Sequence, residues 1–180
     1  MVLVASALAE GSVDESGGDV MRRFALLGAA ALLSACVSVN ADVATTPDPV
    51  LTAIENASPR TCPEGRTQVG AHTQAFGPQH GVAARTIAVT PAAGDESRIV
   101  RLRLLTMEPG AVIAWHSHET TQGMALIVSG AATEIRNSCL DQIVYRAGDV
   151  ALEDAQTAHG WRNDGDESAV ILVAHYAPAS

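Results

Sequence analysis

Short apolar segments separated by turn residues fill the second half of the chain, and this pattern constrains the fold more than any other feature. From Gly81 onward each segment is bounded by Gly, Asp, Asn or Pro, and none keeps a helical period over several turns. Many short strands with turns about 8–12 residues apart indicate a β-sandwich or β-barrel. The predicted strands are 82–89, 99–106, 111–118, 124–129, 131–135, 142–145, 150–152, 159–162 and 169–176.

Residues 21–36 have the order of a secretory signal. Met21 is followed by two arginines, an apolar core and small residues before Cys36. The ending Leu-Ser-Ala-Cys resembles the lipobox of bacterial lipoproteins, a family in which this cysteine becomes the lipidated first residue. We therefore expect an exported protein on the periplasmic side of a bacterial membrane, anchored by lipid on Cys36. A short buried helix is the alternative interpretation of this apolar stretch.

The rest of the chain divides by composition. Residues 1–20 are acidic without a basic residue, which is wrong for an export leader, so we interpret them as a misassigned start or a disordered extension. Residues 37–50 are small and polar and predict a linker. A short helix is expected to begin at Pro49 with Asp48 as its cap. Residues 51–81 form a mostly irregular N-terminal extension, and residues 82–180 form the β-barrel domain.

The chain has a net charge of −9 and contains no lysine. Such a surface does not suit nucleic acid, which requires clustered positive charge. It also lacks a basic patch for peripheral membrane binding, which leaves the lipid anchor as the only membrane contact. For an exported chain, Cys62 and Cys139 predict a disulfide, with two buried free thiols as the alternative.

Two of the six histidines, His116 and His118, are separated by one residue. In a strand, residues two apart point to the same face, so both imidazoles project together. His159, in a later strand, is the candidate third ligand. Neutral imidazoles suit Zn, Cu, Fe or Ni, which predicts a metal site. The alternative is that these are polar side chains on a solvated strand face.

Two motifs around these histidines resemble those of the cupins. The first runs from Gly110 through the His-Ser-His sequence to Gly130, and the second combines Gly148 and His159 with Asn163 at the family spacing. The resemblance covers roughly residues 82–177. It implies a jelly-roll barrel of short antiparallel strands. It also implies one divalent ion (Fe, Mn, Ni, Cu or Zn), a small-molecule ligand or substrate, and a homodimer, because cupins often dimerise.

The fourth ligand departs from this pattern. Many cupin enzymes place a glutamate seven positions before the closing glycine, and here that position is Gly123. Gln122 is one position away and is the candidate replacement. Glu119 has the right charge but should face away from His118 if the strand continues. A set of two or three histidines with water ligands would leave open positions for a substrate or O₂.

Other residues are candidates for shaping the pocket. Trp161 and Asn163 share the strand parity of His159, and Asn163 is alternatively a turn residue. Glu134 is a candidate pocket carboxylate or a solvated edge residue, and Tyr145 is a candidate polar contact or an ordinary barrel residue. We interpret His175, in an apolar strand, as structural.

Three functions remain open from the sequence. The first is a metal-dependent enzyme of the dioxygenase or isomerase kind acting on a small organic molecule. The second is a non-enzymatic metal- or ligand-binding cupin that senses or stores. The third is a structural cupin without metal. The missing glutamate favours the second and third functions, and the three histidines favour the first and second.

Overall fold

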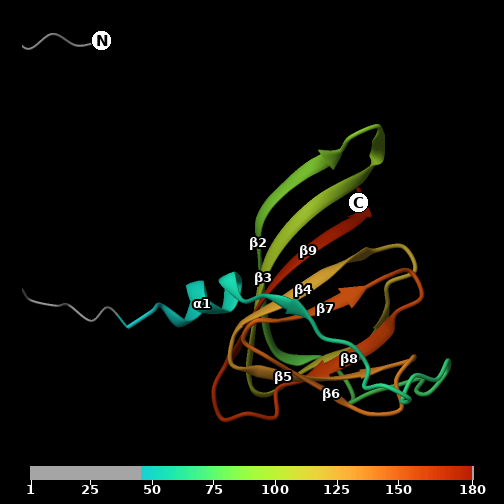
Figure 1. Ribbon diagram of the computed structural model, residues 1–180. Coiled ribbons are helices and arrows are strands. Elements are labelled where there is room, and N and C mark those ends of the chain that lie inside the picture. Colours follow the sequence, from blue (N-terminus) through green and yellow to red (C-terminus); the bar gives the residue numbers. More distant parts are fainter. Residues whose placement is uncertain (1–45, 180) are drawn as a thin grey trace, which may run out of the picture. The chain divides into compact units, whose positions relative to one another are not determined.

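Strands account for most of residues 46–179, the part of the chain that the computed structural model describes (Figure 1). The predicted all-β class is confirmed, and one short helix precedes the strands. The elements are α1 (Pro49–Glu55), β1 (Ser58–Pro59), β2 (His80–Ala92), β3 (Asp95–Ser117), β4 (Gln122–Ser129), β5 (Ala131–Arg136), β6 (Ile143–Arg146), β7 (Asp149–Glu153), β8 (Ala158–Arg162) and β9 (Ala169–Pro178).

A single long strand, β3, connects the two layers of the barrel. Its first half pairs antiparallel with β2 and β9, and its second half pairs with β8. Gly110 adopts a φ of 77° between the two halves, and its N–H donates to the carbonyl of Asn163 at 2.9 Å. The sequence predicted two strands separated by a turn here. The glycine instead bends one continuous strand, because its backbone remains paired through the bend.

The strands follow the order β1-β7-β4-β9-β3-β8-β5-β6, with β2 on the outside of β3. Figure 1 shows β2, β3, β9, β4 and β7 side by side in one layer, with β8, β5 and β6 crossing beneath it. Both layers turn alternate side chains inward, which is the jelly-roll arrangement. The enclosed core includes Met107, Ile127, Ile143, Ile171 and Val173.

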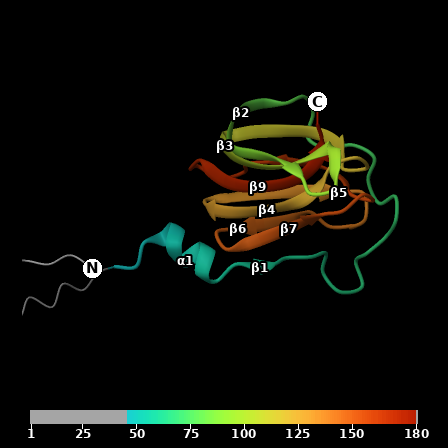
Figure 2. The ribbon, with the colours of Figure 1, turned by 90° about the horizontal axis from the view of Figure 1, so that it is seen from above.

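The N-terminal extension joins this barrel directly. Asp48 caps α1 by accepting the N–H of Val50 at 2.8 Å, as its position before Pro49 predicts. β1, which follows α1 in Figure 2, adds a short parallel strand beside β7. Cys62 and Cys139 form a disulfide across 77 residues, which ties the irregular segment to the loop after β5.

Several sequence predictions lie outside the described residues. These are the extension 1–20, the signal 21–36 with Cys36, and the linker up to residue 45. Within the described part, no helix has the length and apolar character needed to cross a bilayer.

Candidate metal centre

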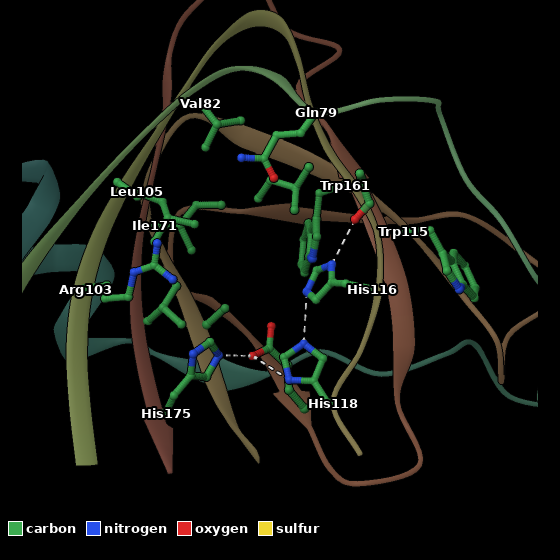
Figure 3. Close-up of a pocket in the computed structure, with 16 residues that line it drawn as sticks. Gln79, Val82, Arg103, Leu105, Trp115, His116, His118, Trp161, Ile171 and His175 are labelled. Atoms are coloured by element: carbon green, nitrogen blue, oxygen red, sulfur yellow. Dashed lines mark hydrogen bonds and ion pairs between the residues drawn. The ribbon is translucent and has the colours of Figure 1, made fainter. Parts of the chain in front are cut away.

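His116, His118 and His159 come together at the inner face of β3 and β8. His116 and His159 are register partners on these two strands. His118 follows the end of β3, where its N–H donates to Thr157 O at 2.8 Å and so keeps the backbone alongside β8. The three Nε2 atoms lie 2.9–3.2 Å from one another. Figure 3 shows His116 and His118 directed at each other inside the cavity.

Each of these rings is oriented by an acceptor at its other nitrogen. The Nδ1 contacts are His116 to Ala114 O at 2.9 Å, His118 to Thr121 O at 2.9 Å, and His159 to Glu134 Oε1 at 2.5 Å. A carbonyl or carboxylate oxygen accepts only, so each Nδ1 carries the hydrogen and each Nε2 presents a lone pair. Three converging lone pairs repel unless a cation lies among them. This is the second-sphere arrangement that orients histidine ligands in metal sites.

The electrostatics of the site favour the neutral form of His116 and His118. His118 and His159 are buried, whereas His116 remains accessible from the cavity. Burial lowers the pKa of His118 to about 4, although nearby Glu153 opposes the shift. Burial and the neighbouring His159 also lower the pKa of His116. Neutral imidazole is the form that binds a metal, so at neutral pH both rings are ready as ligands.

The donor set also fits the size of a first-row metal ion. Nitrogen–nitrogen separations of 2.9–3.2 Å correspond to metal–nitrogen bonds of about 2.0–2.2 Å at angles near 90°, roughly one face of a coordination sphere. The three side chains are therefore able to hold a divalent ion. This arrangement leaves the opposite face for further ligands.

The structure corrects the prediction that Gln122 is the fourth ligand. Gln122 opens β4 on the same strand face as Met124, whose exposed fraction is 50%, and both border a shallow depression on the outside of the sheet. Because alternate residues face opposite sides of a strand, Gln122 points away from the histidines. Glu119, which the sequence placed facing away, is exposed in the turn before β4.

A carboxylate reaches the cluster from the neighbouring strand instead. Glu153, at the end of β7, is buried, and its Oε1 lies 3.8 Å from the Nε2 of His159. Its Oε2 lies 3.7 Å from Nδ1 of His118 and 2.9 Å from Nε2 of His175. Burial raises the pKa of Glu153, but the hydrogen bond with His175 and the neighbouring imidazoles outweigh it, so the pKa is lowered overall.

Gly123 explains how this carboxylate reaches its place. In β4 it is the register partner of Glu153 on one side and of His175 on the other, so the three residues form one row across the sheet. A Cβ built on Gly123 would lie 2.6 Å from the His175 ring and even closer to the Ala174 carbonyl. The absent side chain therefore leaves the space in which Glu153 and His175 meet.

His175 is thus part of the site, and its interpretation as a structural residue is corrected. Its ring lies 5.5 Å from that of His118, and it lines the cavity. His118, Glu153 and His175 form a second group whose ligand atoms lie within 4.8 Å of one another. Strand alternation could have predicted this position, because His175 shares its strand face with buried Ile171 and Val173 and therefore points inward.

Glu134 and Tyr145 lie behind the histidines rather than in the cavity wall. Glu134 is fully buried, and its carboxylate accepts hydrogen bonds from His159, Arg136 and Tyr145. Burial and this carboxylate raise the pKa of Tyr145. Both were predicted as pocket residues, and Glu134 alternatively as a solvated edge residue. The structure gives them a supporting position, since β5 packs against β8 with Glu134 directed at the rear of His159.

The remaining pocket predictions divide in two. Trp161 lines the cavity, with its ring 5.6 Å from that of His159. Asn163 does not line it: its amide donates to the carbonyls of Met107 and Glu167 and its oxygen accepts the N–H of Gly165. Asn163 therefore fixes the turn after β8, which is the alternative role that its sequence position indicated. The cavity itself has a volume of about 280 Å³.

Comparison with known proteins identifies a family for this segment. Residues 103–175 match the family model described as a cupin domain, a stretch that contains His116, His118, His159, Glu153 and His175. A search among curated proteins gives no match.

Among solved structures, the chain is similar to three proteins. They are the Schizosaccharomyces pombe Cnp3 cupin domain (12% identity, 55% of this chain and 66% of that chain, TM-score 0.46), KdgF from Halomonas sp. (19%, 61% and 88%, 0.45) and an uncharacterized protein with a double-stranded β-helix domain from Klebsiella pneumoniae (22%, 71% and 88%, 0.43). At these scores and identities the likenesses carry no argument about activity.

Proposed function

Because residues 103–175 form a cupin domain, we propose that this protein binds one divalent metal ion and uses it on a small organic molecule inside the barrel. The observation that carries the proposal is the convergence of three Nε2 lone pairs at 2.9–3.2 Å, with every Nδ1 of the same rings held by an acceptor oxygen. In this proposal His116, His118 and His159 are ligands.

We assign Glu153 as the carboxylate ligand in place of the family glutamate. Its Oε1 is 3.8 Å from the Nε2 of His159. A lowered pKa keeps it ionised at neutral pH, so it offsets the ion's charge in a buried site. The His175 ring holds its other oxygen at 2.9 Å. A carboxylate with neutral imidazoles suits the ions that the sequence indicates, namely Fe, Mn, Ni, Cu or Zn.

The reaction class in this proposal is dioxygenase- or isomerase-like. When bound, the ion would polarise an oxygen-bearing substrate as a Lewis acid, and a redox-active ion would extend this to O₂ chemistry. The protein itself orients the ligands and provides apolar surface around the substrate. Glu134 holds His159 in its tautomer, while Leu105, Ile171 and Trp161 provide apolar surface in the cavity beside the histidines.

Elemental analysis of the purified protein tests the proposal. We expect close to one equivalent of a divalent metal, and none in a variant carrying both His116→Ala and His118→Ala. His72→Ala is the matched control, because His72 lies outside the cluster and contacts the Leu140 carbonyl. Protein that is metal-free and refuses added metal would overturn the proposal. Metal without turnover of any small molecule would leave the sensor or storage function.

We further propose that the protein is exported and anchored by lipid on Cys36. The disulfide between Cys62 and Cys139 supports an oxidising compartment. Labelled palmitate should enter the protein in a bacterial host and be absent from a Cys36→Ala variant. Incorporation that persists in this variant would refute the anchor.

A further inference from the structure

One wall of the cavity carries positive charge that the metal centre does not use. Arg103 shares its face of β3 with Leu105 and buried Met107, and both Arg103 and Leu105 line the cavity. Figure 3 shows the Arg103 guanidinium reaching inward above His175, across the cavity from His116. The side chain therefore faces the same space as the histidines, from the opposite side.

Among residues 46–179, no carboxylate is a cause of the pKa shift of Arg103. Burial lowers the pKa of Arg103, and the next cause is the like charge of Arg101 on the same strand face. Arg101 is the register partner of His175 in β9. A guanidinium remains charged under these conditions. Two arginines thus share one end of the barrel.

The same end contains polar atoms without hydrogen-bond partners. The Nε atom of Arg101 and the Nδ1 atom of His175 are buried and unpaired within the described part of the chain. An unsatisfied buried polar atom costs about 1–3 kcal/mol. Arg101 lies outside the cavity lining, and Nε2 of His175 donates to Glu153, so Nδ1 of His175 is an acceptor. The donors that a ligand with acceptor oxygens meets at this end of the cavity are therefore those of the Arg103 guanidinium.

We propose that Arg103, with Arg101 beside it, binds the carboxylate of a small organic acid whose other end reaches the metal centre. This substrate class rests on the proposed metal-dependent function. A guanidinium presents parallel N–H donors that match the two oxygens of a carboxylate. Leu105, Ile171 and Val173 line the cavity and provide an apolar wall for an aliphatic chain.

The size of the cavity restricts this acid to a short one. Its volume of about 280 Å³ lies at the lower limit of small-molecule sites, which span roughly 300–1,000 Å³. An acid of a few carbons fits this space, whereas a nucleotide or an oligosaccharide does not.

Isothermal titration calorimetry of the metal-loaded protein tests the inference with butyrate and its neutral isostere butyramide. We expect butyrate to bind at least about tenfold more tightly, because only butyrate forms charge-assisted hydrogen bonds with Arg103. Arg103→Gln should remove this preference and leave butyramide binding unchanged. Arg85→Gln is the matched control: Arg85 is exposed and is the register partner of Leu104, which faces away from the cavity.

Equal binding of butyrate and butyramide would overturn the inference, and so would equal losses in Arg103→Gln and Arg85→Gln. Inorganic phosphate that binds more tightly than butyrate would overturn the carboxylate assignment. If Arg103→Gln does not fold, Arg103→Lys replaces it as the test. Lysine keeps the positive charge but lacks the parallel N–H donors of the guanidinium, so this variant should lose part of the preference for butyrate.

Metal content separates this inference from the proposed function. Arg103→Gln should keep the full metal equivalent. A variant that loses the preference for butyrate but keeps its metal then assigns this preference to Arg103 and not to the metal centre. If the wild-type protein takes no metal, the proposed function fails. Butyrate binding is then still measurable by tryptophan fluorescence, since the Trp161 ring lies in the cavity beside His159.

Discussion

Two walls of the barrel supply candidate metal ligands, but they differ in where those ligands come from in the sequence. On the β3–β8 wall, the histidines that the sequence motifs pointed to, His116, His118 and His159, come together. On the β4–β7–β9 wall, the motif carboxylate is absent from Gly123, and Glu153 reaches inward from the strand beside it. Residues in register on adjacent strands share a face, so a carboxylate on the neighbouring strand can reach the space that the motif carboxylate would occupy.

The difference also shows what each wall depends on. The histidine wall needs side chains with fixed tautomers, which carbonyl and carboxylate acceptors provide. The carboxylate wall needs an empty position, because the His175 ring occupies the space that a side chain at Gly123 would fill. One wall therefore depends on hydrogen bonds and the other on steric fit.

Replacing Glu153, on the β4–β7–β9 wall, should have the largest effect on metal affinity. We expect Glu153→Gln to weaken metal binding by about 100-fold, because the variant loses an anionic ligand but keeps its volume. Metal titration with a competing chelator measures the change. Glu119→Gln, which removes the same charge from an exposed residue beside His118, should bind like the wild type. Equal affinities for all three proteins would mean that Glu153 is not a ligand.

Filling the gap at Gly123 tests the steric side of the comparison. The added Cβ of Gly123→Ala would lie 2.6 Å from the His175 ring and would also meet the Ala174 backbone. Crowding of this kind costs roughly 1–3 kcal/mol in the free energy of unfolding. Chemical denaturation reports the loss, and metal affinity should fall with it because His175 positions Glu153. A variant with wild-type stability and affinity would refute the role of this gap.

The substitution Glu134→Gln tests the support of the β3–β8 wall, because Glu134 contacts the ring nitrogen of His159 that faces away from the cluster. The amide of glutamine can present N–H instead of oxygen to Nδ1 of His159, so the tautomer is no longer fixed and Arg136 loses its charged partner. Changes in such supporting residues weaken metal binding by about 10–100-fold, and we expect the lower part of this range. Chelator competition at a temperature well below the melting point separates this effect from unfolding. An unchanged affinity would show that the backbone alone orients His159.

The smallest effect should be the pH dependence of the metal-free protein. Its folded state holds His118 with a pKa of about 4, whereas an unfolded histidine titrates near about 6.5. Between these values the unfolded chain binds more protons, so the free energy of unfolding should fall as the pH is lowered from about 6.5. Thermal melting down to about pH 5 avoids most carboxylate titration. His118→Gln should show a flatter profile, and identical profiles would contradict the assignment.

Much of the fold was predictable because it depends on local patterns. Turn residues at short intervals predicted the strands of an all-β barrel, and Asp48 followed by Pro49 predicted the start of α1. The union of two predicted strands into β3 was not predictable. Pro109 and Gly110 look like a turn in sequence, and only pairing with β8 and the Asn163 carbonyl keeps the strand continuous.

By itself, the sequence determined the histidine half of the site, because a pair of histidines two residues apart shares a strand face wherever that strand lies. Only the tertiary structure decided the carboxylate half and the charged wall. Glu153 and His175 meet across Gly123 because three strands align in register, and Arg103 faces the histidines because β3 bends between the layers. Strand alternation is a local property of the chain. Which residues become neighbours across strands depends on register, which forms only when the barrel closes.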